Sequence, residues 1–271
     1  MGLHTLRLTV IVIVCGLAGC GRIASSASVS TVPQTIRTLP DKITAEDDPH
    51  LIVSKALEAV GGVAKLNRWN VGKVKYKANM PNSPIDGTDT TMEDTFQLPG
   101  HLKRVTHGEK NGEKSTYIWV LNNGSGWEKR DSGAPTEITN AATERTRHYL
   151  AENINFAALA DSGVKLTGLG DAKVGDRPVV VVKAEPEGAA PVDCYIEKTT
   201  AFVLKFVRVG PDPRTKRDAT LTTYLDDYKL IQGGMVPMRI KGFVGDQPLI
   251  EVLITDLQFF DKLDASEFAK P

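Results

Sequence analysis

The stretch RPVVVVKAEPEGAAPVDCYIEKTTAFVLKFVRV, residues 177–209, indicates how this chain folds. It holds three runs rich in valine, isoleucine and phenylalanine, divided only by the short segments EPEGAA and EKTT. β-Branched and aromatic residues favour strands, whereas glycine and proline favour turns. Because no helix separates the runs, the sequence predicts strands that pair antiparallel.

The same pattern extends in both directions. In KVKYKA, residues 73–78, apolar positions alternate with lysines, which predicts a strand with one buried and one wet face. Further strand-like runs lie at 91–98, 102–107, 115–121, 126–130, 164–169, 219–231, 236–244 and 248–260. In total the sequence predicts about eleven or twelve strands, a number that must curl to bury one face.

Two segments are expected to be helical. At the first, DDPHLIVSKALEAVGG, Asp47 or Asp48 can cap the helix, Pro49 fits the first helical position and Gly61-Gly62 ends it. The second covers residues 137–160. We therefore expect a mainly β (α+β) fold, a half-open antiparallel barrel of about eleven strands with helices covering or plugging the concave face. A barrel wider than eight strands leaves room for a helix or a ligand.

The first 20 residues resemble a bacterial lipoprotein signal. A short apolar segment ends in Leu17-Ala18-Gly19-Cys20, which matches the lipobox at all four positions. The resemblance implies that residues 1–19 are removed and that Cys20 carries a diacylglycerol; the alternative is an ordinary secretory signal with an incidental cysteine. Residues 20–47 are rich in Ser, Thr and Ala and are expected to form a tether spanning about 30 Å. The folded domain is expected over 48–271.

Composition and motifs narrow the class of function. The chain carries 33 basic and 33 acidic residues, a balance that does not favour a nucleic-acid partner. Besides Cys15 and Cys20 the one remaining cysteine is Cys194, which is expected to be a small buried residue. The segment NGSGW lacks the spacing of a nucleophile elbow, and no phosphate loop or dinucleotide fingerprint occurs. No metal-ligand spacing joins the histidines at 50, 101, 107 and 148. We expect a protein that is not an enzyme and has neither metal nor cofactor.

Several phrases resemble the superfamily of LolA and LolB, the periplasmic carrier and outer-membrane receptor of lipoproteins. They are residues 174–207, residues 222–242 with Gly234, Pro237 and Ile240, and the ending EVLITDLQFFDKLDASEFAKP with its stub from Asp264 to Phe268. The opening ALEAVGGVAKLNRW is similar to the first helix of lipoproteins in the same group. The resemblance implies an incomplete barrel of about eleven strands, covered by helices, with an apolar cavity that receives acyl chains.

Regular alternation places nine apolar residues on single faces of three predicted strands. They are Val74, Tyr76, Ala78, Tyr117, Trp119, Leu121, Ile250, Val252 and Ile254. These side chains would line a ligand cavity, or alternatively pack against the helices as core. Trp127, at the start of a strand, would lie at the cavity mouth or pack at an edge.

These features together predict a lipid-anchored protein of the bacterial cell envelope that faces the periplasm from the inner or outer membrane. It would bind the acyl chains of lipoproteins or lipids for transport or sorting. The alternative is an interaction or sensor module whose barrel is filled by its own side chains and which meets an envelope protein partner.

Overall fold

The computed structural model describes residues 42–79, 90–98, 100–110, 112–138, 159–160, 162–187, 190–212, 214–215 and 217–271. Within them lie the helices α1 (Pro49–Val60) and α2 (Val63–Leu66) and the 3-10 helix η2 (Ala265–Phe268). The strands are β1 (Val71–Asn79), β2 (Thr90–Gln97), β3 (His101–Lys110), β4 (Glu113–Asn122), β5 (Ser125–Arg130), β6 (Thr136–Glu137), β7 (Lys165–Val174), β8 (Arg177–Glu185), β9 (Val192–Glu197), β10 (Val203–Pro211), β11 (Asp218–Ile231), β12 (Gly234–Val244) and β13 (Gln247–Phe259).

All thirteen of these strands form one antiparallel sheet, in the order β6-β5-β4-β3-β2-β1-β13-β12-β11-β10-β9-β8-β7. Two meanders, β1 to β6 and β7 to β13, therefore meet where β1 pairs with β13. The predicted fold class, a mainly β open sheet with few helices, is confirmed. The strand count exceeds the prediction because β6 has only two residues, too few to give a sequence pattern.

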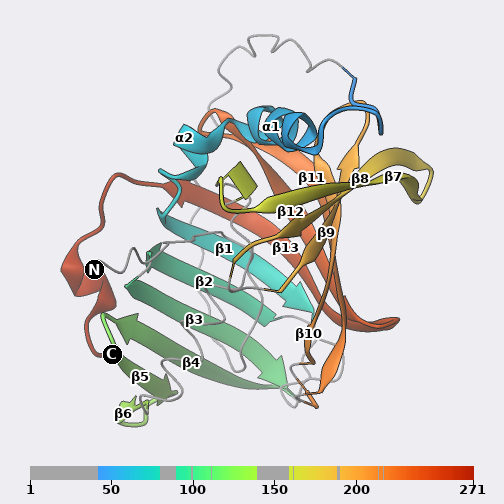
Figure 1. Ribbon diagram of the computed structural model, residues 1–271. Coiled ribbons are helices and arrows are strands. Elements are labelled where there is room, and N and C mark those ends of the chain that lie inside the picture. Colours follow the sequence, from blue (N-terminus) through green and yellow to red (C-terminus); the bar gives the residue numbers. More distant parts are fainter. Residues whose placement is uncertain are drawn as a thin grey trace.

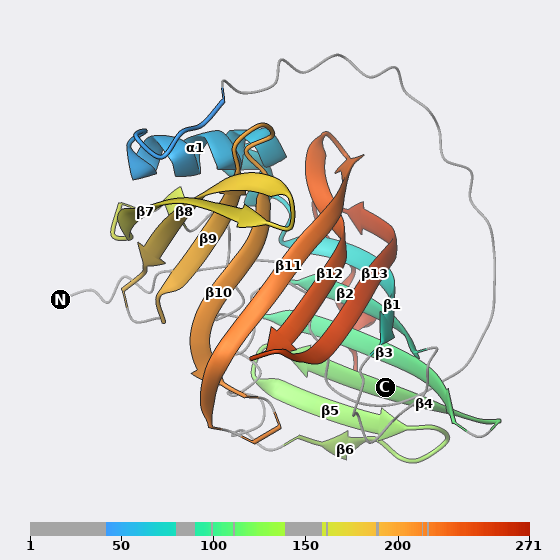
Figure 2. The same ribbon diagram turned by 90° about the vertical axis from the view of Figure 1, so that its right-hand side faces the viewer.

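The sheet is strongly curled. β8 to β11 stand at a steep angle to β1 to β5, and α1 crosses one end of the opening between them (Figures 1 and 2). Leu121 of β4 and Val182 of β8, near opposite ends of the strand order, belong to one buried apolar cluster that also contains Ile52 and Leu57 of α1. The face that carries this cluster is therefore the concave face.

Helix α1 follows the predicted signals. The carboxylate of Asp48 accepts a hydrogen bond from the backbone N–H of His50, Pro49 begins the helix, and Gly61 ends it with a φ of +130°. The positive φ explains the glycine, since other residues rarely adopt it. The buried residues of the helix are Ile52, Val53, Ala56, Leu57 and Val60. This apolar face packs toward β7, β8 and β12.

The folded part begins earlier than the predicted boundary at residue 48. Ile43 is fully buried, and its N–H donates to the carbonyl of Lys198 at 3.2 Å. An isolated isoleucine in a polar segment gives no periodic signal, so the sequence placed it in the tether. Of the predicted helix at 137–160, Glu137 belongs to β6, and residues 139–158 lie outside the described residues. Residues 1–41, with the lipobox, also lie outside them.

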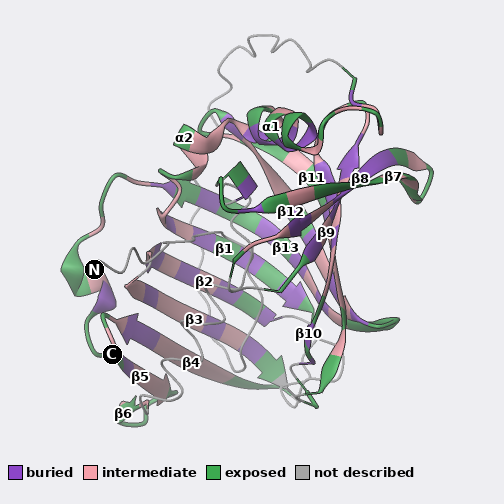
Figure 3. Ribbon diagram, in the orientation of Figure 1, coloured by how far each residue is buried: buried purple, intermediate pink, exposed green. Residues whose placement is uncertain are grey.

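Burial alternates along the central strands (Figure 3). In β1, Val74, Tyr76 and Ala78 are buried, whereas Lys75 and Lys77 between them are exposed. This is the period of two that the sequence predicts, with the apolar phase on the concave face. No described helix is long and apolar enough to cross a membrane.

The ring of Trp69, which follows α2, packs against the backbone of the sheet at Gly234. The ring of Trp69 stacks on that of Phe259 with centroids 4.6 Å apart, and a Cβ on Gly234 would lie 2.4 Å from Trp69. Only glycine therefore fits at the start of β12. This explains the first residue of the Gly-x-x-Pro-x-x-Ile phrase in physical terms.

Candidate functional site

The strand register brings all nine predicted residues to the concave face. Val74 lies opposite Asp94 of β2, and the row continues through Arg104 of β3 to Trp119 of β4. The next row runs from Tyr76 through Met92 and Thr106 to Tyr117, and a third ends at Leu121. On the other side, β1 pairs with β13 so that Tyr76 faces Ile254 and Ala78 faces Val252, and Ile250 is two residues further along the same face.

Burial divides these nine residues into two groups. Seven are at most 5% exposed: Val74, Tyr76, Ala78, Leu121, Ile250, Val252 and Ile254. All seven belong to the large apolar cluster, so they pack against other side chains. Tyr117 and Trp119 are only half-buried. The concave face is therefore closed over β1, β13 and the Leu121 end of β4, and partly accessible at Tyr117 and Trp119.

A buried ion pair, which the sequence analysis missed, lies between these two regions. The guanidinium of Arg104 donates two hydrogen bonds to the carboxylate of Asp94, each of 2.7 Å. The Tyr76 hydroxyl donates to the same carboxylate at 3.2 Å. The side chains of Asp94 and Arg104 are only 5% and 12% exposed. A signal was present, because Asp94 shares the apolar phase of Met92 and Phe96.

A second polar group lies one strand further out. The Tyr117 hydroxyl donates a short hydrogen bond to the carboxylate of Glu128 on β5, and the guanidinium of Arg130 lies 5.8 Å from the centre of the Tyr117 ring. Burial, the hydrogen bond to Glu128 and the charge of that carboxylate raise the pKa of Tyr117 well above its usual range. The phenol therefore stays neutral and acts as a donor.

One hydroxyl of this face has no partner. Thr106 is fully buried in the row between Met92 and Tyr117, and among the described residues its Oγ1 has no hydrogen-bond partner. An unsatisfied buried hydroxyl costs about 1–3 kcal/mol. Such a buried group beside the half-buried Tyr117 is a candidate contact for a ligand.

Trp127 does not belong to the candidate site. It pairs with Val120, whereas Trp119 pairs with Glu128, so the two tryptophans lie on opposite faces of the sheet. The convex location of Trp127 makes it a natural control for Trp119.

The described residues contain no group of three or more His, Cys, Asp or Glu side chains that could hold a metal ion. The His101 ring packs 5.0 Å from Phe268 and contacts the side chain of Asn123. Cys194 of β9 is fully buried, as the sequence predicts, and burial raises the pKa of its thiol far above the usual range.

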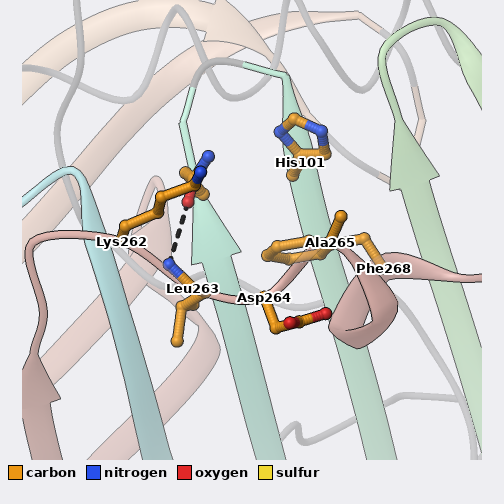
Figure 4. A pocket seen from close by; sticks show the side chains of 7 residues that line it. His101, Lys262, Leu263, Asp264, Ala265 and Phe268 are labelled. Carbon is orange, nitrogen blue, oxygen red and sulfur yellow. Dashed lines mark hydrogen bonds between the residues drawn. The ribbon is translucent and has the colours of Figure 1, made fainter.

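A separate pocket of about 610 Å³ lies beside the C-terminal stub (Figure 4). Its lining residues are Gln97, His101, Lys262, Leu263, Asp264, Ala265 and Phe268. The N–H of Leu263 donates to the side-chain oxygen of Gln97 at 3.1 Å. The Asp264 carboxylate accepts from Ser266, which lowers the pKa of Asp264. In the alternation along their strands, Gln97 and His101 fall on the other face of the sheet from the nine candidate residues. This pocket is therefore separate from the candidate site on the concave face.

No protein-family model matches the chain, and no curated protein matches its sequence. Among solved structures, the fold is similar to a LolA superfamily protein from Nitrosomonas europaea, with 12% identity and a TM-score of 0.49 over 84% of this chain and 98% of that one. It is also similar to a domain described as an outer membrane lipoprotein-sorting protein from Vibrio parahaemolyticus, with 12% identity and a TM-score of 0.48 over 82% and 96%.

A third similar structure is a DUF1329 family protein from Desulfovibrio piger, with 9% identity and a TM-score of 0.49 over 82% of this chain and 98% of that one. One of these three structures is thus described as a LolA superfamily protein, the group that the sequence resembles.

Proposed function

We propose that this protein is a lipid-anchored envelope protein that holds the acyl chain of a lipid or lipoprotein against the concave face of its sheet. The anchor is the diacylglycerol expected on Cys20, and the domain faces the periplasm. The protein would receive or hold its ligand for transport or sorting.

One observation supports the proposal above the others. Trp119 is half-exposed and packs against the buried apolar cluster, and Tyr117 lies two residues from it on the same face, so an accessible aromatic surface borders the cluster beside the Asp94–Arg104 pair. Buried apolar surface contributes about 25 cal/mol per Å² without any directional requirement, which suits chains of varied length. An aromatic wall next to a closed core is a typical lining of an apolar ligand site.

Quenching of tryptophan fluorescence by an acyl chain that carries bromine near its middle tests the proposal. Bromine quenches only at short range, so a chain on the concave face should quench Trp119. We expect saturable quenching of the wild-type protein, loss of most of it in Trp119→Phe, and little change in Trp127→Phe. The second variant is the matched control, because Trp127 lies on the convex face of the same strand pair.

Equal loss in both variants would indicate nonspecific association with the surface. An absence of saturable quenching, together with no lipid in the mass spectrum of the purified protein, would refute acyl-chain binding.

The anchor is tested separately. Cys20→Ala should release the protein from the membrane fraction, and mass spectrometry of the wild-type protein should find two or three acyl chains on the N-terminal peptide. A wild-type protein without acyl mass would overturn the lipobox assignment and favour an ordinary secretory signal. The result does not depend on whether the concave face binds a ligand.

Burial of seven of the nine candidate residues favours a second function. A concave face that is filled by its own side chains suits an interaction or sensor module with an envelope protein partner. The two functions differ in the quenching experiment, since a sensor module with a filled barrel would take up no acyl chain.

A further inference from the structure

The unpartnered Thr106 hydroxyl indicates what kind of ligand the concave face is built for. Three polar side chains next to it on this face are paired: Tyr76 and Arg104 bind Asp94, and Tyr117 binds Glu128. Thr106 is fully buried among them and has none. A wholly apolar ligand would not need a hydroxyl here, and a valine would fill the same space without the cost of desolvation.

Cross-strand pairing puts Thr106 beside the accessible part of the face. It is the direct neighbour of Tyr117, which is half-buried, and is followed on β3 by the small Gly108. Among its cross-strand neighbours, the half-buried Tyr117 is therefore the side chain through which a ligand would approach the hydroxyl.

The charges of the region balance. Two carboxylates, Asp94 and Glu128, share the face with two guanidinium groups, Arg104 and Arg130. In the neighbouring row the Arg104 guanidinium is already bound by both oxygens of Asp94. A ligand carboxylate would therefore lose its hydration without gaining a counter-ion, whereas a neutral carbonyl would lose much less.

We propose that Thr106 donates a hydrogen bond to the neutral carbonyl of an ester- or amide-linked acyl chain, so that the protein prefers esterified or amidated acyl chains to free fatty acids and to alkyl ethers. This inference rests on the proposed acyl-chain binding and adds to it the position and chemistry of the ligand's polar end. The carbonyl would lie at Thr106, and the apolar chain would lie along Trp119.

Two ligands that differ only in the carbonyl test it: 1-dodecanoyl glycerol and 1-O-dodecyl glycerol, each titrated into the full-length protein by calorimetry. We expect the wild-type protein to bind the ester about five- to tenfold more tightly than the ether, the factor expected for one ordinary hydrogen bond. Thr106→Val should reduce this ratio to about one by weakening only the ester. Thr106→Ser retains the hydroxyl and is expected to retain the preference.

The same variant has a second readout in the absence of ligand. Because Thr106→Val removes an unsatisfied buried hydroxyl while keeping the side-chain shape, its Tm should rise by about 2–4 °C. The variant would therefore be more stable and yet bind the ester less tightly, a combination that a merely structural defect does not produce.

The outcomes distinguish a failure of the role of Thr106 from a failure of the proposed acyl-chain binding. Binding of both ligands with an equal ester-to-ether ratio in the wild type and in Thr106→Val overturns the role of Thr106 and leaves acyl-chain binding intact. Dodecanoate is titrated as a third ligand, and its binding more tightly than the ester overturns the preference for a neutral carbonyl. Binding of none of these ligands refutes both proposals.

Discussion

Removing one partner of the ion pair between Asp94 and Arg104 should destabilise the fold strongly, and replacing the second partner as well should restore part of the lost stability. The two hydrogen bonds are each 2.7 Å long, and both side chains are nearly excluded from solvent. Asp94→Leu would leave the Arg104 guanidinium buried without its counter-ion, at an expected cost of about 3–5 kcal/mol. That is a substantial part of the 5–15 kcal/mol, roughly, by which a typical domain is stable.

The second substitution should relieve the first. In Asp94→Leu/Arg104→Met no buried charge remains, and apolar side chains of similar size fill the space, so at least about half of the loss should be recovered. Urea unfolding followed by circular dichroism measures the free energy of unfolding of the wild-type, both single variants and the double variant. Circular dichroism is preferred to fluorescence because Trp119 lies next to Arg104 in the same row.

A neighbouring surface pair provides the control. Lys75 of β1 and Glu93 of β2, which precedes Asp94 but lies on the convex face, are 2.9 Å apart with side chains 54% and 44% exposed. Glu93→Gln should therefore cost less than about 1 kcal/mol. The reasoning fails if the double variant loses the sum of the two single losses, because the two charges would then be independent, or if Glu93→Gln costs as much as Asp94→Leu.

Three further predictions follow from described contacts. Gly234→Ala should lower the free energy of unfolding by about 1–3 kcal/mol, measured by urea titration, because the new Cβ would overlap the ring of Trp69. The hydrogen bond from Arg177 lowers the pKa of Glu197, so this carboxylate stabilises the fold above its unfolded pKa of about 4.3 and less as the pH falls toward the folded pKa. Between pH 6 and 3 the free energy of unfolding should therefore fall less steeply in Glu197→Gln than in the wild type. An equal slope in the two proteins would contradict the assignment. Alkylation followed by peptide mapping should leave Cys194 unmodified in the folded protein and modify it after unfolding, since burial keeps the thiol protonated and covered.

The strand pattern could be predicted from sequence because it depends on local alternation. In β1 the lysines and apolar residues separate cleanly, and the turns are marked by glycine, proline or threonine, so the type and order of the long strands follow directly. The two-residue β6 and the buried Ile43 gave no such signal, since one edge pairing and one docked side chain are set by tertiary contacts.

The candidate site was predictable in part. Alternation identified which residues share the concave face, because residues that pair across neighbouring strands lie on the same face of the sheet. It could not separate the buried Val74 from the half-exposed Trp119, since exposure depends on what covers each strand. The pairing of Asp94 with Arg104 was also out of reach, although an acid in an apolar phase is a sign that a partner is required.

The pairing of β1 with β13 has a consequence for how the protein matures. These two strands come from nearly opposite ends of the described domain, yet they form the seam in the middle of the sheet. Neither meander can join the other until the last strand is available, so folding depends on contacts of very long sequence separation and is expected to be slow. A chain that emerges from a narrow channel N-terminus first could thus close this sheet only after its final strand had emerged.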